Sequence, residues 1–435
     1  LFLSANTTSG GIEELFVRTV RTLGEINNEK SMKKKVKILF VPDTIWGVSS
    51  GHRSAQKVVK IFSELSYKIG IFAPDSEDSE LKHELINYDY DFFNRTPFRY
   101  YNIVINSKKK QEFEDVIHDF QPGFVLFFGT SGFNILAEVC LENKIKYFMQ
   151  FLTTDYYCTK NFAGLENGPC FKCIKGNYYH SFKNKCYLKK PILVNIIKEV
   201  AIRKTNRELI LSADKILGYS KDQINDYEKF GVPKDKLAVT PIFFDRKHLT
   251  EVSSTLGDYF LLSGQVSVAK GWHKLWEIIE KCPDIKFKLL FSSMNVALES
   301  LDKYNLTKYY NSGQISVETN IEKHSDLLNI VSNARGFIIP SYYPTTGEFF
   351  LLETLGLGKV ALTFDSGVHK EIISHGVNGM IAEVNDVKKF SDNIKLINSD
   401  DVLCNKISLE AKNLFEYLIS DNRFKTSLVE IFAID

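Results

Sequence analysis

The sequence contains no long hydrophobic run. No window reaches the 18 or so apolar residues of a membrane-spanning helix, and the longest apolar stretches, such as 192–202, are interrupted by lysine and glutamate. It also lacks a large excess of either charge, because 55 lysines and arginines stand against 53 acids and leave a net charge of +2. These absences argue against an integral membrane protein and against nonspecific binding of nucleic acid, which needs a basic surface.

Cysteine is scarce as well. Seven cysteines in 435 residues do not make a disulfide framework, and their odd number favours a reducing compartment. The opening residues, LFLSANTTSGG, lack the charged n-region of a secretory signal peptide. We therefore expect a cytoplasmic protein.

What the sequence does contain is a repeated alternation of strands and helices. Apolar runs of strand length, such as KVKILFVPD and GFVLFFG, are followed by amphipathic helical segments, first from Lys35 and again after Asp245. Alternating strands and helices predict parallel sheets covered on both faces. The fold class is therefore α/β, with two doubly wound Rossmann-like domains that face a central cleft.

The predicted domain boundaries follow from this alternation. We assign an amphipathic helix or fused segment, an acceptor-side domain with a cysteine-rich insertion, a donor domain, and a closing helix that packs back on the first domain. Their ranges are 1–31, 32–245 with the insertion at 156–190, 246–415 and 416–435.

Two glycine-containing turns follow the first strands of the two domains. Ser50 and Gly51 end a small-residue turn before a helix, where backbone N–H groups can approach an anion. In the second domain, Gly264 is followed by Lys270, whose ammonium at the head of a helix suits a diphosphate. Read alone, the first is an ordinary turn and the second a solvated lysine. Neither domain has GxGxxG with a later ribose acid, which argues against a dehydrogenase.

Two further elements complete the pattern. The segment PSYYPTTGEFFLLETLGLGKVAL places Glu353 in a helix that begins beside the cleft, where a carboxylate can accept both hydroxyls of a ribose. Its alternative is a helix-start acid stabilised by the helix dipole. The segment from Asp365 to Glu371 then precedes the turn HGVNGMI.

Taken together, the order and spacing of these elements resemble the GT-B fold glycosyltransferases of family 4, which transfer sugar from a nucleotide donor with retention. The resemblance covers residues 35–430. The matching positions are Gly264, Lys270, Gly271, Pro340, Ser341, Glu353, Gly358, Gly367, Glu371 and Gly379.

The resemblance implies a hexosyltransferase and assigns roles by position. Lys270 would neutralise the donor diphosphate and Glu353 would hold the ribose, while Asp155 stands at a family aspartate in the first domain. The other donor-binding positions are Ser50, Gly51, Gly264, Gln265, Ser293, Gln314, Thr345, Thr346, Gly347, Glu348 and Phe349. It implies no catalytic metal, because lysine and helix dipoles stabilise the departing diphosphate.

Three positions depart from the family pattern. Gln265 stands where relatives have a diphosphate arginine, Thr345 replaces the first glutamate of the Glu-x7-Glu motif, and Thr154 replaces a histidine. These changes support an alternative, in which the chain is a catalytically impaired nucleotide- or sugar-binding module or an assembly partner.

The insertion contains the pattern C-x11-C-x2-C-x12-C, formed by Cys158, Cys170, Cys173 and Cys186. Four thiolates with one x2 spacing can close a tetrahedral zinc site. Two disulfides and four free thiols are the other interpretations of the same spacing.

The implied partners are a UDP- or GDP-sugar donor and an acceptor hydroxyl on a glycan or a lipid-linked glycan. Eight basic residues lie among apolar ones between 183 and 207. Such a segment can rest on anionic lipid at the inner face of a membrane, or it can be a solvated helix face.

Overall fold

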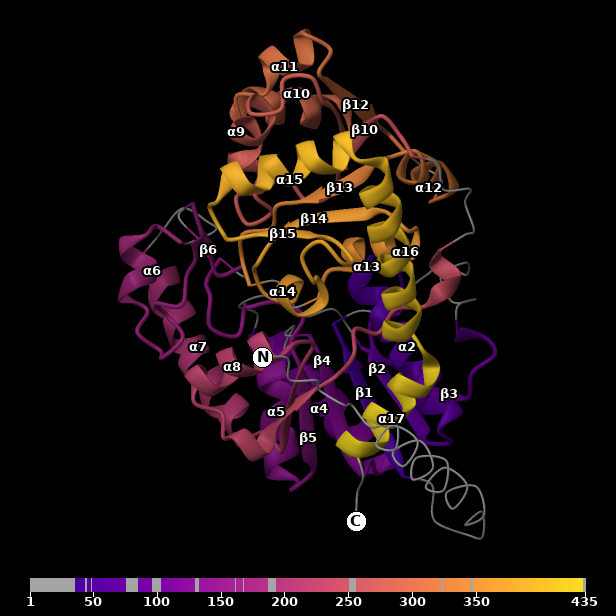
Figure 1. Ribbon diagram of the computed structural model, residues 1–435. Helices are drawn as coiled ribbons and strands as arrows, with labels where there is room; N and C mark the ends of the chain where they lie inside the picture. Colours follow the sequence, from indigo (N-terminus) through magenta and orange to yellow (C-terminus); the bar gives the residue numbers. More distant parts are fainter. Residues whose placement is uncertain are drawn as a thin grey trace, which may run out of the picture. The chain divides into compact units, whose positions relative to one another are not determined.

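The computed structural model describes most of the chain after residue 35. The described residues are 36–43, 45–47, 49–75, 85–95, 103–129, 133–160, 162–166, 168–186, 193–249, 256–321, 324–344 and 347–432. The predicted segment 1–31 lies outside them. Two parallel sheets, drawn in indigo to magenta and in orange, form the frame of the described chain (Figure 1).

The first sheet has seven parallel strands in the order β3-β2-β1-β4-β5-β8-β9. Its strands are β1 (Lys37–Pro42), β2 (Lys68–Ala73), β3 (Tyr90–Asn94), β4 (Phe124–Phe128), β5 (Lys146–Gln150), β8 (Lys215–Gly218) and β9 (Leu237–Val239). In the central strand β1, Ile38 pairs with Ile69 on one side and Phe124 on the other, and all three are fully buried. The apolar runs thus form the interior of the sheet, as the sequence predicts.

Helices connect these strands. They are α2 (Ser50–Glu64), α4 (Ile103–Phe120), α5 (Phe133–Glu142), α7 (Leu193–Ser212) and α8 (Lys221–Phe230). Helix α8 has clear end signals, because the Ser220 hydroxyl accepts from the Gln223 amide and Gly231 closes the helix at φ +115°. The insertion between β5 and α7 carries a small antiparallel hairpin, β6 (Gly164–Leu165) and β7 (Gly168–Pro169), and the short helix α6 (Tyr179–Lys183).

The second sheet has six parallel strands in the order β12-β11-β10-β13-β14-β15. The strands are β10 (Tyr259–Leu262), β11 (Lys286–Phe291), β12 (Ile315–Thr319), β13 (Gly336–Ile339), β14 (Val360–Phe364) and β15 (Met380–Ala382). Helices α9 (Leu275–Glu280), α10 (Met294–Lys303), α11 (Thr307–Asn311), α12 (His324–Ser332), α13 (Phe349–Gly356), α14 (His369–Ile372) and α15 (Val387–Ser399) accompany them.

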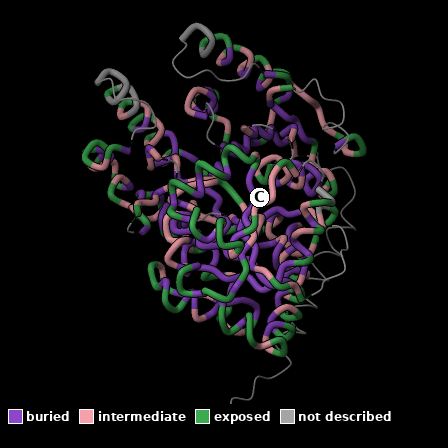
Figure 2. The backbone as a smooth tube through the Cα atoms, turned by 90° about the horizontal axis from the view of Figure 1, so that it is seen from above, coloured by how far each residue is buried: buried purple, intermediate pink, exposed green. Residues whose placement is uncertain are grey.

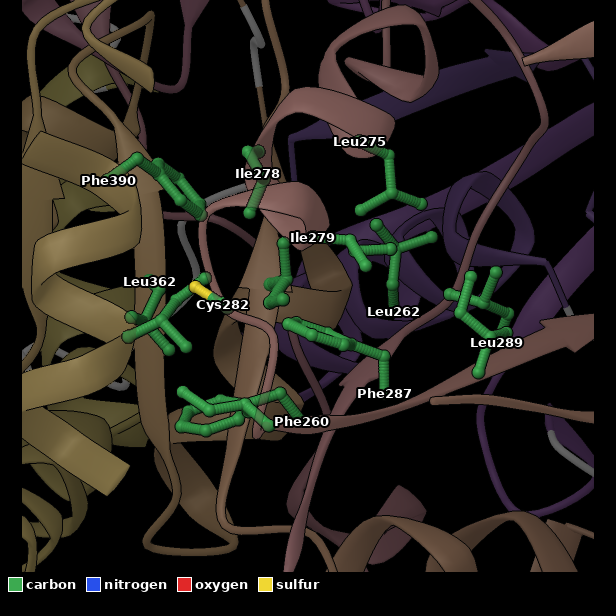
Figure 3. Packing of buried hydrophobic residues seen from close by; sticks show 14 of the residues in the cluster. Phe260, Leu262, Leu275, Ile278, Ile279, Cys282, Phe287, Leu289, Leu362 and Phe390 are labelled. Carbon is green, nitrogen blue, oxygen red and sulfur yellow. The ribbon is translucent and has the colours of Figure 1, made fainter. Parts of the chain in front are cut away.

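The core of the second domain packs side chains from its strands against helices α9 and α15. Figure 3 shows Phe260 and Phe287 from adjacent strands beside Ile279 of α9, with Phe390 of α15 on the far side of the cluster. Cys282 lies inside this apolar group, so it is an ordinary buried thiol. Buried segments gather in the interior of the body, and exposed ones lie on the surrounding helices (Figure 2).

The chain ends with two helices, α16 (Asp401–Leu418) and α17 (Asp421–Phe432). Helix α17 packs on the first domain, since the ring of Phe432 lies 5.4 Å from that of Phe62, 5.1 Å from that of Phe124 and 5.2 Å from that of Phe148. The first sheet falls within 32–245 and the second within 246–415, while the boundaries themselves stay predictions.

The strand order determines where ligands can bind. In each sheet the order reverses beside the first strand of the domain, between β1 and β4 and between β10 and β13. Ligands of open parallel sheets bind at the carboxyl ends of strands beside such a reversal. Ligand binding is therefore expected at the loops after β1 and β4 in the first sheet and after β10 and β13 in the second.

Candidate functional site

One cavity of about 480 Å³ lies at the carboxyl ends of both sheets. Ser50, Arg53, Leu152 and Thr153 line it from the first domain. The second domain contributes Leu262, Ser263, Gly264, Lys270, Leu327, Ile338, Ile339, Pro340, Ser341, Tyr343, Gly347, Glu348, Phe349, Phe350 and Glu353. Its size is in the range of small-molecule sites, and its wall combines charged and hydroxyl side chains with apolar ones.

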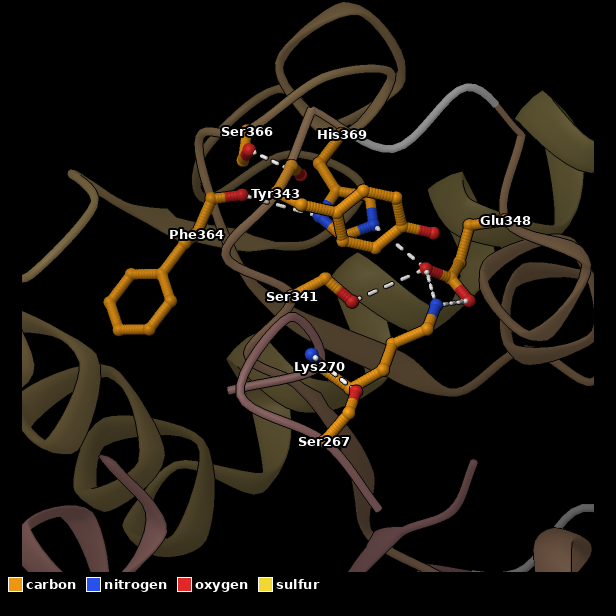
Figure 4. A network of polar contacts seen from close by, with 8 residues as sticks. All are labelled: Ser267, Lys270, Ser341, Tyr343, Glu348, Phe364, Ser366 and His369. Atoms are coloured by element: carbon orange, nitrogen blue, oxygen red, sulfur yellow. Dashed lines mark hydrogen bonds and ion pairs between the residues drawn. The ribbon is translucent and has the colours of Figure 1, made fainter. Parts of the chain in front are cut away.

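Lys270 forms the strongest ion pair of the cavity with Glu348. The lysine Nζ lies 2.8 Å from each carboxylate oxygen of Glu348, and the Ser341 hydroxyl donates to the same carboxylate at 3.3 Å. His369 Nε2 stands 3.7 Å from it, and the Tyr343 ring lies 5.2 Å from Lys270 Nζ (Figure 4).

The pKa directions of the two partners agree. Burial alone raises the pKa of Glu348 and lowers that of Lys270, since it penalises both charged forms. The mutual attraction outweighs burial, with help from His369 on one side and Tyr343 on the other. It holds the pKa of Glu348 well below its usual range and that of Lys270 above its usual range. Both groups are therefore ionised at neutral pH.

Gly264 and Gly271 determine the backbone path of the loop after β10, which carries Lys270. Gly271 has φ +78°, and a Cβ there would lie 2.0 Å from the Pro340 carbonyl oxygen, so only glycine lets the two loops approach this closely. Gly264 has φ +119° and open space where a Cβ would stand. The loop after β10 therefore presents bare backbone to the cavity just before Lys270.

Glu353 lies one turn into α13 and faces Arg53 of α2. Arg53 Nη1 is 3.6 Å from Glu353 Oε1, and the two side chains are 15% and 18% exposed. Burial raises the pKa of Glu353 to about 7; Arg53 opposes the rise and the charge of Glu348 adds to it. Glu353 therefore titrates near neutrality.

Seven of the fourteen predicted catalytic and donor-binding residues come together here. Lys270, Glu353, Ser50, Gly264, Gly347, Glu348 and Phe349 all line the cavity, although they come from both domains. Gly51 lies beside the lining residue Leu152, because a Cβ added to Gly51 would stand 3.6 Å from Leu152 Cδ1. Asp155 follows the lining residues Leu152 and Thr153, and its carbonyl oxygen accepts from Arg203.

Three other predicted positions lie outside the cavity lining. Gln265 is exposed beside Gly264. Ser293 caps helix α10 through the Val296 amide, and Gln314 donates to the Cys282 carbonyl at 2.7 Å. The last two therefore have structural partners, and the donor-binding role of all three stays a prediction. Thr345 and Thr346 lie outside the described residues.

The sequence patterns did not single out Arg53 and Tyr343. Arg53 follows the predicted Ser50 and Gly51 in the first turn of α2. Because residues three apart lie on the same face of a helix, Arg53 lines the cavity together with Ser50. Tyr343 follows the predicted Pro340 and Ser341 in the same loop. No spacing rule pairs Lys270 with Glu348, which lies 78 positions away.

The cysteine-rich insertion borders the cavity. The Phe162 ring packs edge-on against Tyr343 at 5.6 Å, and His273 Nε2 lies 3.1 Å from the Glu166 carbonyl oxygen. The four cysteines of the insertion line one small cavity of about 20 Å³. All four are free thiols, and no three His, Cys, Asp or Glu side chains of the described chain are grouped so that they could hold a metal ion.

The basic segment before α8 is partly turned inward. Arg203 is buried against the Asp155 carbonyl, and Arg207 bonds to the carbonyls of Ile174 and Phe230. Arg207 therefore fastens the insertion to helix α8, and Arg203 holds the backbone just before the insertion. No described helix is both long and apolar enough to cross a bilayer.

Comparison with protein families gives a match within the second domain. Residues 253–414 match the family described as Glycosyl transferases group 1, which covers the second sheet and its cavity loops. No curated protein matches the sequence.

Solved structures match nearly the whole chain at low identity. A glycosyltransferase from Rickettsia africae ESF-5 is 17% identical with a TM-score of 0.62, over 92% of this chain and 98% of that one. HepE from Anabaena, in complex with UDP, is 13% identical with a TM-score of 0.62, over 92% and 100%. Sucrose-phosphate synthase from Thermosynechococcus elongatus is 11% identical with a TM-score of 0.63, over 92% and 98%. The chain thus has the GT-B fold, and the family match supports glycosyl transfer as its chemistry.

Proposed function

We propose that the protein is a retaining, family 4 hexosyltransferase that moves a sugar from a UDP- or GDP-sugar to a hydroxyl of a glycan or glycolipid acceptor. The observation that carries the proposal is the cavity of about 480 Å³ at the carboxyl ends of both sheets, with Lys270 and Glu353 in its wall. The UDP complex of HepE supports UDP as the first nucleotide to test.

Six of the residues that line the cavity have roles in this proposal. Lys270 stabilises the diphosphate as negative charge develops on it, so no catalytic metal is needed. Glu353 accepts the ribose hydroxyls, and the backbone at Gly264 leaves room for the phosphates. Gly347, Glu348 and Phe349 border the sugar.

The reaction would proceed on one face of the sugar. The acceptor hydroxyl attacks the anomeric carbon from the side that the diphosphate leaves, and a donor phosphate oxygen takes the hydroxyl proton. The loop from Leu152 to Asp155 reaches the cavity from the first domain and would approach the acceptor. Phe162, which precedes the hairpin of the insertion, would exclude water on that side through its contact with Tyr343.

We assign the reaction to the cytoplasm, at the inner face of a membrane where a lipid-linked acceptor is held. The basic residues of 183–207 other than the inward-turned Arg203 and Arg207 support the assignment. The alternative of an impaired binding module rests on Gln265, Thr345 and Thr154, and no contact in the described chain favours it.

The test is binding of UDP, GDP, ADP and their common sugar conjugates to wild type and to Lys270→Ala. A nucleotide at 100 times its dissociation constant should stabilise the wild type by about 2.7 kcal/mol, visible as a higher melting temperature. Lys270→Ala should lose that stabilisation, because it removes the diphosphate cation. Lys274→Ala is the matched control, because Lys274 is not one of the lining residues. Its Nζ pairs with Glu277 Oε1 at 2.9 Å.

A second variant separates binding from folding. Lys270→Ala leaves the Glu348 carboxylate buried without its partner, which destabilises the fold by itself. Lys270→Met with Glu348→Gln removes both charges, so its stability should recover while nucleotide binding stays lost. Wild type that binds no nucleotide and hydrolyses no sugar nucleotide would overturn the proposed function.

A further inference from the structure

The charges that line the candidate site balance in the ligand-free protein. Among the described lining residues, Lys270 and Arg53 are cationic and Glu348 and Glu353 are anionic. A nucleotide diphosphate brings further negative charge into this cavity. It therefore needs a cation that can leave its present partner.

The two ion pairs differ in how firmly they are made. Lys270 meets both oxygens of Glu348 at 2.8 Å, and Ser341 adds a third hydrogen bond to that carboxylate. Arg53 and Glu353 approach no closer than 3.6 Å, beyond the length of a good hydrogen bond. Glu353 also keeps a pKa of about 7 despite the neighbouring guanidinium, because burial outweighs that attraction. Separating Arg53 from Glu353 therefore costs less free energy than separating Lys270 from Glu348, so Arg53 is the cation that can bind a new anion.

The position of Arg53 suits that exchange. It lies in the first turn of α2 in the first domain, whereas Lys270 and Gly264 line the same cavity from the second domain. A guanidinium offers two parallel N–H donors that match phosphate oxygens, which a lysine does not. Gln265, the neighbour of Gly264, is exposed and carries no charge.

We propose that Arg53 is a diphosphate-binding residue that the first domain contributes to the donor site, and that it releases Glu353 to the ribose when the donor binds. The inference rests on the proposed function and deepens it. It also predicts that donor binding ties the two domains together through α2 and the loop after β10.

The experiment measures dissociation constants of UDP and GDP by calorimetry at pH 8 for wild type, Arg53→Gln, Arg53→Lys and Lys57→Gln. Lys57 lies one turn further along α2 and pairs with Asp421 at 2.9 Å, so its variant removes the same charge from the same helix outside the site. Arg53→Gln should weaken binding about 10- to 100-fold, as expected for hydrogen bonds to a charged group. Arg53→Lys should fall between, and Lys57→Gln should equal wild type.

Uridine and guanosine, which lack phosphates, distinguish a phosphate contact from a general change of shape. Their binding, followed by ligand-observed NMR, should be no weaker in Arg53→Gln than in wild type, because the variant removes the residue that pairs with Glu353. Equal loss of nucleoside and diphosphate, or Arg53→Gln that binds like wild type, would overturn the inference while leaving the proposed function intact. Wild type that binds neither diphosphate would overturn both. If Arg53→Gln does not fold, Arg53→Lys carries the comparison.

Discussion

Glu353 connects the chemistry of the site to pH. Its pKa of about 7 comes from burial, with Arg53 opposing and Glu348 adding to the rise. A carboxylate accepts two ribose hydroxyls well only when ionised. Lys270 is already engaged by Glu348, so Arg53 is the cation that faces Glu353.

We therefore predict that affinity for UDP-glucose increases between pH 6 and pH 8. About one tenth of Glu353 is ionised one unit below its pKa, so binding at pH 6 should be roughly tenfold weaker than at pH 8. UDP-glucose is the probe because it lacks the terminal phosphate of UDP, which itself titrates near pH 6. Glu353→Gln should bind weakly and equally at both values. A wild-type affinity that does not change with pH would contradict the role of Glu353.

Glu353 also affects the pH dependence of folding stability, with a sign opposite to its effect on donor affinity. Its folded-state pKa lies above the unfolded value of 4.5, so the folded state binds more protons between pH 4.5 and pH 7. The contribution of Glu353 to the stability of the ligand-free protein should thus fall as pH rises through this window. Its contributions to donor binding and to the stability of the free protein therefore have opposite pH dependence.

At the scale of single residues, the sequence predicts local positions better than their partners. Lys270, Gly264 and Glu353 all line the cavity. The sequence predicts their positions because strand ends and helix starts can be recognised from apolar runs and glycines. The pairing of Lys270 with Glu348 depends on how two loops 78 positions apart meet at Gly271. No local pattern carries that information.

At the scale of elements, strongly apolar strands are predicted and weakly buried ones are missed. The pattern of apolar residues predicts no element for the stretch that forms β3 and α4. Each residue of β3 is half-buried or exposed, because it is an edge strand of the first sheet, so it has neither a continuous apolar run nor clean alternation. Helix α4 has charged residues in its centre, which weaken its apolar stripe.

The cysteine-rich insertion is an element whose ligand is still a prediction. Its four thiols line one cavity, and Cys158 and Cys186 come from opposite ends of the segment. Burial raises the pKa of Cys173 to about 11, and the neighbouring thiols add to the rise. Zinc binds the thiolate form, so zinc binding must release the Cys173 proton and must move the side chains into coordination, because no described group of ligands is arranged to hold a metal.

We predict that protein purified without chelator contains one zinc per chain, measured by mass spectrometry of the metal. Cys173→Ser should lower both the zinc content and the melting temperature, whereas Cys404→Ser, which changes a core thiol of the second domain, should leave zinc unchanged. A metal-free chain whose mass is about four daltons low would indicate two disulfides. Seven titratable thiols in a metal-free, stable chain would indicate free cysteines.

At the scale of the whole molecule, helix α17 links the two domains. Helix α17 follows the second domain in sequence but packs on the first, where Phe432 lies among Phe62, Phe124 and Phe148. Two ion pairs border this contact, Lys57 with Asp421 and Lys425 with Glu64, each at 2.9 Å. The first domain is thus completed by residues outside 32–245, which makes its stability depend on the last twelve-residue helix.

Phe432→Ala should therefore destabilise the first domain and leave the second nearly unchanged. Phe432 is 1% exposed, and removal of a fully buried ring costs about 3–5 kcal/mol. Two domains need not unfold together, so the probe must report on one of them. Trp46 is the tryptophan of the first domain and Trp272 and Trp276 belong to the second. Urea unfolding followed by Trp46 fluorescence in a Trp272→Phe, Trp276→Phe background isolates the first domain.

Tyr417→Ala is the matched control, since Tyr417 is 64% exposed near the end of α16 and its loss should change the Trp46 transition by under about 0.5 kcal/mol. If Phe432→Ala also shifted that transition by under about 1 kcal/mol, α17 would be a passive cover. A full shift would instead mean that the two domains share one structural element opposite the cavity. Donor-driven closure would then have to bend the chain between α16 and α17, at Ile419 and Ser420, rather than separate α17 from the first domain.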